Sequence, residues 1–215
     1  MKISFTKMHG LGNDYIYLNC MEGEPKYPDM LALAMSPRRF SVGGDGLVLI
    51  CHSAVADAKM RMFNADGSEG KMCGNAIRCV GKYLYDNRIV PKEEMTIETL
   101  SGIKRLHLNL FAGKVQTVGV DMGQATLAPS AIPVLFEGER MVSEPVEVEG
   151  STYNITAVSV GNPHAVIFLD DVNSLNLEQL GPRFEHLPLF PDRVNTEFVR
   201  PIDAATLQMR VWERG

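Results

Sequence analysis

Short alternating runs of apolar and polar residues dominate the chain, and turn residues separate them at close spacing. Alternation with a period of two predicts β-strands, because successive side chains of a strand point to opposite faces. Glycine, proline, asparagine and aspartate mark the turns between the runs. The predicted strands span residues 3–8, 15–19, 46–51, 58–64, 95–99, 103–110, 114–121, 132–136, 152–160, 165–169, 196–201 and 206–213.

Two segments of the first half have helical spacing instead. Residues 29–40 begin with an acidic side chain, which is favourable near a helix N-terminus. The second helix begins just after Cys73 and runs to about residue 87, and apolar side chains cover most of its circumference. A helix that is apolar nearly all round is buried, so we expect strands wrapped around it. Cys79 lies on a different face of this helix from Cys73, and we expect it to pack in the core.

The chain also shows a faint internal repeat. Residues 60–64 and 209–213 share the order apolar, basic, apolar, aromatic, polar. Strand alternation then predicts that Asn64 and Glu213 point inward, toward the core side of their strands. Gly67 and Gly215 follow at similar places. The change from one half to the other is expected within residues 121–133, and residues 137–150 are expected to form a surface excursion.

Composition narrows the class of protein. The 215 residues are 45% hydrophobic and carry a net charge of −5 without a basic cluster, so we expect no nucleic-acid partner. No apolar run approaches the roughly 20 residues of a membrane span. The N-terminus is typical of a strand rather than a signal peptide, which favours a cytoplasmic protein. The four cysteines form no Cys-x-x-Cys pair, so no metal site is expected, and Cys20 and Cys51 are predicted to be inert core residues.

The strongest chemical signal is the run from Phe63 to Ala76, which ends a strand, turns, and places Cys73 at the start of a helix. Backbone N–H groups and the helix dipole favour a thiolate there, and the same N–H groups can bind a carboxylate. This arrangement indicates proton chemistry on a small acid. The glycine-rich loop at residues 43–46 lacks the spacing of a phosphate loop and precedes no predicted helix, so nucleotide binding is rejected.

Other polar residues are ambiguous when each is taken alone. Residues 9–14 read His-Gly-Leu-Gly-Asn-Asp, which is also the composition of an ordinary turn. The Gly-Asn-Pro-His run at residues 161–164 has a histidine that can be purely structural. An inward Glu213 is harder to explain structurally, because buried carboxylates need a partner or a task. Arg214 can pair with it or hold a substrate carboxylate, whereas Asn195 by itself is uninformative.

Together, residues 7–14, 63–78, 161–164 and 212–215 resemble diaminopimelate epimerase, and the resemblance runs along the whole chain. It implies an α+β fold of two pseudo-symmetric domains, each with antiparallel strands around a central helix, here at residues 1–121 and 122–215. It implies a cofactor-independent isomerase that converts LL-2,6-diaminopimelate to the meso isomer, in lysine and cell-wall precursor biosynthesis. The implied partner is a small amino acid, with no cofactor and no metal, and a homodimer is left open.

The resemblance also implies roles for single residues. Cys73 is implied as one of two catalytic thiols, with His164 and Glu213 in supporting roles. The implied substrate contacts are Asn13, Asn64, Gly74, Asn75, Asn162, Asn195, Glu213 and Arg214.

Two departures from the family pattern matter. Some relatives carry glutamine where this chain has Gly46, so one polar contact is expected to be absent. The family's second thiol belongs just after Gly215, where this sequence ends. We therefore expect a second domain without its catalytic cysteine and central helix, and a 215-residue chain that is inactive by itself and unstable in its second half. The alternatives are a related racemase of the proline racemase type, or a non-catalytic amino-acid-binding module.

Overall fold

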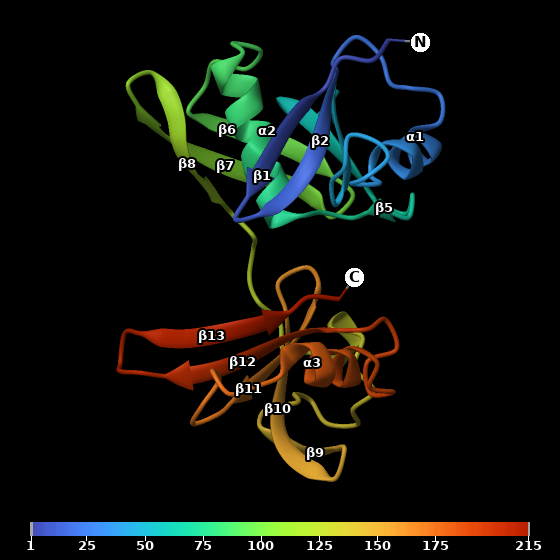
Figure 1. Ribbon diagram of the computed structural model, residues 1–215. Coiled ribbons are helices and arrows are strands. Elements are labelled where there is room, and N and C mark those ends of the chain that lie inside the picture. Colours follow the sequence, from blue (N-terminus) through green and yellow to red (C-terminus); the bar gives the residue numbers. More distant parts are fainter. Residues whose placement is uncertain (1, 215) are drawn as a thin grey trace. The chain divides into compact units, whose positions relative to one another are not determined.

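The computed structural model describes residues 2–214 and divides into two compact units, Met1–Met122 and Gly123–Gly215 (Figure 1). Each unit has a β-sheet of its own and a hydrophobic core of its own. Strands outnumber helices in both, which confirms the α+β class. No helix within residues 2–214 has the length and apolar character needed to cross a membrane.

The first unit contains an eight-stranded sheet with the order β1-β2-β3-β4-β6-β7-β8, and β5 pairs with β4. Neighbouring strands are antiparallel except for the parallel pairs β2–β3 and β4–β6. Its elements are β1 (Thr6–Gly10), β2 (Asn13–Cys20), α1 (Pro28–Met35), β3 (Gly46–Cys51), β4 (Ala58–Asn64), β5 (Glu69–Gly70), α2 (Gly74–Asp86), β6 (Glu94–Thr99), β7 (Gly102–Phe111) and β8 (Lys114–Val120).

The sheet of the first unit curls around α2, as Figure 1 shows. The helix contacts β1, β2, β7 and β8, and its Ile77, Val80 and Leu84 are completely buried. Burial of each such side chain stabilises the fold by about 1.5–3 kcal/mol. Cys79 is 6% exposed within the same core. The predictions of a central helix and of a packing role for Cys79 are confirmed.

Helix α1 is shorter than the sequence predicts. It ends at Met35 rather than near Phe40, and Phe40 is 93% exposed. Pro37 explains the early end, because Ser36 still has helical backbone angles but proline has no N–H to continue the helical hydrogen bonds. The helix covers a separate buried cluster that includes Ala32, Cys20 and Cys51.

The second unit contains a five-stranded sheet with the order β13-β12-β11-β10-β9, in which only the β11–β12 pair is parallel. Its elements are a 3₁₀ turn (Pro129–Ala131), β9 (Glu144–Val148), β10 (Ser151–Ser159), β11 (Pro163–Phe168), α3 (Leu177–Glu185), β12 (Asn195–Pro201) and β13 (Leu207–Trp212).

Helix α3 and strand β9 are absent from the sequence-based prediction, and the strand predicted at residues 132–136 does not form. There the chain turns back on Pro129, which accepts hydrogen bonds from the backbone of Ile132 and Val134 while both side chains pack into the core. The alternating burial in this segment, which resembles that of a strand, is therefore produced by a loop. Strand β9 lies in the segment expected to be a surface excursion.

The core-facing side of β13 is the opposite of the predicted one. Trp212 packs against α3, where a Cβ on Gly181 would lie 2.1 Å from the indole, and its Nε1 donates to Glu185 (2.8 Å). Glu213 follows the end of the strand and is exposed, so the prediction that it points inward is wrong. Alternation identifies which residues share a face, but not which of the two faces is buried. In β13 the buried face is the one that carries Trp212, because its indole packs against α3. Gly215, which the repeat matched with Gly67, lies outside the described residues.

Candidate active site

Cys73 is the N-cap residue of α2, with extended backbone angles (φ −136°, ψ 119°). Its Sγ accepts a hydrogen bond from the Ala76 backbone N–H (3.5 Å), and Gly74 and Asn75 form the first turn beside it. Of the four free cysteines, Cys73 alone is partly exposed. Because the first N–H groups of a helix have no acceptor within it, this turn can receive both a thiolate and a carboxylate.

The β1–β2 hairpin brings Asn13 to the thiol. Leu11 (φ 55°) and Gly12 (φ 90°) make its two-residue turn, so that Asn13 starts β2 opposite Gly10. Gly10 lies so close to α2 that a Cβ there would be 2.8 Å from the Asn75 carbonyl oxygen. Asn13 Oδ1 accepts from the Cys73 thiol and from Asn75 Nδ2, each at 3.4 Å.

Two further residues, Tyr15 and Asp45, lie near Cys73 and Asn13 but were not predicted from the sequence as site residues. Tyr15 is 5% exposed, and burial, with the nearby Cys73 sulfur as a second cause, raises the pKa of its phenol. Asp45 accepts from Asn13 Nδ2 (2.7 Å) and from the Asp14 backbone N–H (2.9 Å). The sequence feature that points to Asp45 is the glycine-rich loop at residues 43–46.

Asn64 lies at the end of β4 and is partly buried. Its Nδ2 donates to Ser68 Oγ (2.9 Å), and its backbone N–H donates to the Ser68 carbonyl (2.8 Å). These bonds hold Asn64 within its own turn. At Gly46 a Cβ would lie 2.0 Å from the Phe63 carbonyl oxygen. The β3–β4 pairing of this chain therefore leaves no room for a side chain at this position.

A second polar group lies at the start of β11 and β12, where His164 pairs in register with Asn195. His164 Nδ1 lies 2.6 Å from Glu197 Oε1, and its Nε2 lies 2.9 Å from Asn162 Oδ1. Glu197 was not predicted, although alternation places it on the same face as Asn195. Its other carboxylate oxygen is buried without a hydrogen-bond partner among the described residues.

Asn195 and Arg214 are also joined. Asn195 is 7% exposed, and its Oδ1 accepts from the Arg214 backbone N–H (2.9 Å). The Arg214 guanidinium donates to the Asp192 carbonyl (2.7 Å). The second unit thus gathers Asn162, His164 and Asn195 with the backbone of Arg214, while Glu213 is exposed beside them.

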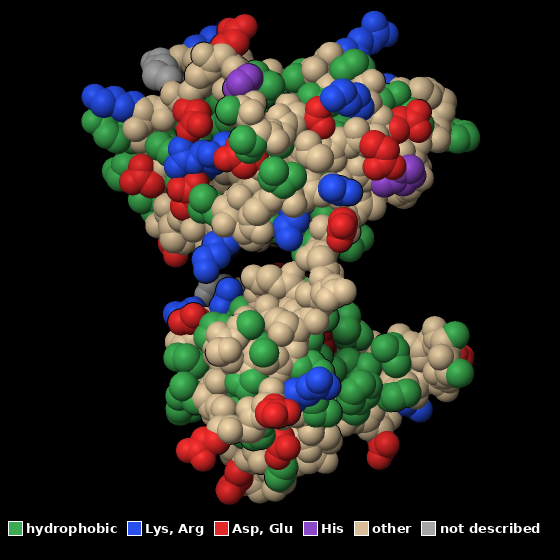
Figure 2. Space-filling model, turned by 180° about the vertical axis from the view of Figure 1, so that it is seen from behind, with side chains coloured by type: hydrophobic (Ala, Val, Ile, Leu, Met, Phe, Trp, Pro, Cys, Tyr) green, Lys and Arg blue, Asp and Glu red, His purple; other side chains and the backbone are tan. Residues whose placement is uncertain are grey.

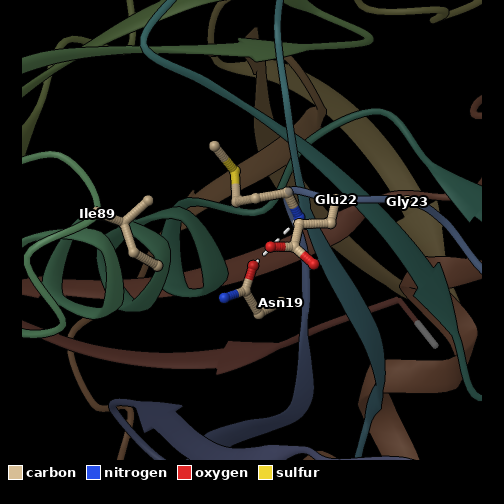
Figure 3. A pocket seen from close by; sticks show the side chains of 5 residues that line it. Asn19, Glu22, Gly23 and Ile89 are labelled. Atoms are coloured by element: carbon tan, nitrogen blue, oxygen red, sulfur yellow. Dashed lines mark hydrogen bonds between the residues drawn. The ribbon is translucent and has the colours of Figure 1, made fainter.

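A pocket of about 570 Å³ lies elsewhere in the first unit, and Figure 3 shows the side chains that line it. It is lined by Asn19, Met21, Glu22, Gly23 and Ile89, and the Met21 backbone N–H donates to Asn19 Oδ1 (3.1 Å). None of the predicted site residues lines it. Within residues 2–214, no three histidine, cysteine or acidic side chains are grouped closely enough to hold a metal ion.

Comparison with known proteins decides the family. The sequence model of the family described as diaminopimelate epimerase matches residues 5–128 and 156–215. The chain belongs to the diaminopimelate epimerase family. It is 56% identical to the diaminopimelate epimerase of Acetivibrio thermocellus over 98% of this chain and 75% of that protein. The corresponding enzyme of Desulfovibrio desulfuricans is 54% identical, over 99% of this chain and 76% of that protein.

Membership of the diaminopimelate epimerase family makes the protein an isomerase. Among solved structures, a hydroxyproline epimerase from Agrobacterium vitis superposes with a TM-score of 0.65 at 14% identity. That match covers 96% of this chain and 69% of the other. At this identity the match shows a common fold, in agreement with the α+β class.

Proposed function

We propose that the protein epimerises LL-2,6-diaminopimelate to the meso isomer without a cofactor, with Cys73 as one of two thiols that act on the α-carbon. The observation that carries the proposal is the partly exposed Cys73 at the N-terminus of α2, beside Asn13 and Asn75, in a chain about half identical to named diaminopimelate epimerases. The reaction would serve lysine and cell-wall precursor biosynthesis.

The first turn of α2 supports this chemistry. Because Cys73 directly precedes Gly74 and Asn75, its thiolate would lie beside an amino acid bound at their N–H groups and could remove the α-proton. General acid–base catalysis contributes typically about 10²–10⁴-fold, which is too little for so weak an acid as an α-C–H. The remaining acceleration must come from groups that stabilise charge developing on the carboxylate, and the N–H groups at the positive end of the helix dipole are suited to this.

Inversion also needs a proton donor on the opposite face of the α-carbon. Cys20 and Cys51 pack under α1, and Cys79 packs in the core around α2. Burial excludes all three from that role, so these 215 residues carry one of the two proposed thiols. By themselves we expect them to exchange the α-proton without inverting the α-carbon at a normal rate. We further propose substrate contacts for Asn13, Asn64, Gly74, Asn75, Asn162, Asn195, Glu213 and Arg214, with His164 and Glu213 supporting the thiol chemistry.

The test follows both the stereochemistry and the α-proton. The protein is incubated with LL-diaminopimelate in D₂O, the isomers are separated by chiral chromatography, and deuterium is measured by mass spectrometry. We expect deuterium at the α-carbon, and a loss of at least about 10²-fold in Cys73→Ala, because this variant lacks the base. Cys79→Ala is the matched control and should retain exchange, since Cys79 only packs.

Three results would overturn the proposal. They are deuterium exchange that survives in Cys73→Ala, racemisation of L-proline without action on diaminopimelate, and binding of diaminopimelate by folded protein without exchange. The last two correspond to a proline racemase type of activity and to a non-catalytic binding module.

A further inference from the structure

The glycine-rich loop between α1 and β3 carries a carboxylate that reaches the neighbourhood of the thiol. Asp45 Oδ2 lies 2.7 Å from Asn13 Nδ2 and 2.9 Å from the Asp14 backbone nitrogen. Its other oxygen, Oδ1, accepts from Arg38 Nη2 (2.7 Å). Arg38 also donates to both carboxylate oxygens of Asp14, at 2.6 and 3.2 Å. Its guanidinium therefore links the glycine-rich loop to the start of β2.

These contacts determine which way the Asn13 amide points. An ionised carboxylate only accepts hydrogen bonds, so the amide group that faces Asp45 must be the donor, Nδ2. The acceptor, Oδ1, must then face the other way, toward Cys73 Sγ and Asn75 Nδ2. The positions of the Asn13 amide oxygen and nitrogen are thus fixed by which neighbours donate and which accept hydrogen bonds.

The orientation matters for the thiol. The Asn13 oxygen accepts a hydrogen bond from the protonated sulfur, but it cannot donate a hydrogen bond to a thiolate. The reversed amide would offer an N–H donor, which stabilises a thiolate. We propose that Asp45, held by Arg38, is a positioning residue that keeps the Asn13 acceptor on Cys73 and so sets the balance between thiol and thiolate. This inference rests on the proposed role of Cys73 as the reactive thiol.

The test is a double-mutant cycle read by alkylation of Cys73 with iodoacetamide at pH 7, where the rate follows the thiolate population. Asp45→Ala frees the Asn13 amide to reverse, and we expect alkylation about three- to tenfold faster, the equivalent of one hydrogen bond. Asn13→Ala removes the amide that could reverse and leaves the Asp45 carboxylate in place. Adding Asp45→Ala to that variant changes only the local charge and the loop, so we expect a clearly smaller acceleration than in the Asn13 background.

A merely structural role for Asp45 gives a different pattern. If its removal acted only through the lost charge or a loosened loop, alkylation would become faster by the same factor in the wild-type and Asn13→Ala backgrounds, and the proposal would be wrong. An unchanged rate in Asp45→Ala alone would also overturn it. Far-UV circular dichroism establishes that each variant is folded.

Asp57→Ala is the matched control. Asp57 likewise accepts from a backbone N–H, that of Thr96 at 2.9 Å, and pairs with a cation, Lys92. We expect its removal to leave Cys73 alkylation at the wild-type rate. Because the cycle needs no substrate, it separates the two proposals. A failed cycle with intact epimerisation rejects the positioning role alone, and a successful cycle without epimerisation rejects the proposed function alone.

Discussion

At the residue scale, Cys73 differs from the other three cysteines in exposure and in surroundings. It borders polar groups of Asn13 and Ala76, whereas Cys20, Cys51 and Cys79 are each no more than 6% exposed. Contact with the neighbouring Cys20 thiol, together with burial, raises the pKa of Cys51. Burial likewise raises the pKa of Cys79. A deprotonated, accessible sulfur is the form that reacts with electrophiles.

Cys73 should therefore be the cysteine that alkylates first in the folded protein. We expect limiting iodoacetamide to label Cys73 and to leave the three buried cysteines unmodified until the protein is unfolded in urea. Peptide mapping by mass spectrometry measures the order of labelling. Earlier labelling of Cys20, Cys51 or Cys79 under native conditions would contradict this interpretation.

At the element scale, close approaches of strands and helices depend on the absence of a Cβ at particular positions. Gly181 admits the indole of Trp212 beneath α3, and Gly10 admits the first turn of α2. Gly46 lies against the backbone of β4, directly across from Asn64. The end of β4 and the glycine loop that carries Asp45 are thus fixed to each other through a backbone contact.

Gly46→Ala should weaken the β3–β4 pairing, because its Cβ would lie 2.0 Å from the Phe63 carbonyl oxygen, an atom that the backbone holds in place. We expect the free energy of unfolding to fall by about 3 kcal/mol, the upper end for overpacked sites. Urea unfolding followed by circular dichroism measures it. Gly119→Ala in β8 is the control, since its Cβ would meet only atoms at 3.7 Å or more. Equal stability of the two variants would refute the argument.

At the scale of the whole molecule, charge is distributed in pairs rather than in one patch. Figure 2 shows acidic and basic side chains interspersed on the displayed face of the first unit. Several of its carboxyls have pKa values below their ordinary range, among them Asp14, Asp57 and Asp86. Arg38 is the largest cause at Asp14, with Lys7 adding to it, and together they lower its pKa to about 2. Carboxyls of this kind make stability depend on acid pH.

The sign of this dependence can be tested at Asp14. Its folded pKa of about 2 lies below the ordinary value of 3.8, so its contribution is complete above pH 4 and is lost as the pH falls toward 2. Exposed ion pairs contribute about 1 kcal/mol or less. We expect Asp14→Asn to be less stable than the wild type at pH 7, and the difference in the free energy of unfolding to shrink between pH 4 and pH 2. Urea unfolding across this range measures it.

Arg38→Met provides the matched control, because it removes the largest cause of the Asp14 shift while keeping the carboxyl. It should lose a similar pH-dependent part of the stability. A difference between Asp14→Asn and the wild type that stayed constant from pH 7 to pH 2 would contradict the assignment.

The sequence by itself determined what depends on neighbouring residues. Alternation predicted twelve strands, and eleven of them form. The nearly all-round apolar character of residues 76–84 predicted the buried helix α2. The turn before Gly74 placed Cys73 at a helix N-terminus. These features follow from side-chain periodicity and helix capping, which act within a few residues.

Only the tertiary structure decided what depends on contacts between distant segments. Gly181 and Pro182 argue against a helix locally, yet α3 forms because it packs on Trp212, which is distant from it in the chain. The same ring turns β13 so that Glu213 is exposed. Asp45, Tyr15 and Glu197 join the predicted site residues through strand pairing and loop packing. The local sequence pattern cannot predict such contacts, because each depends on which face a distant element covers.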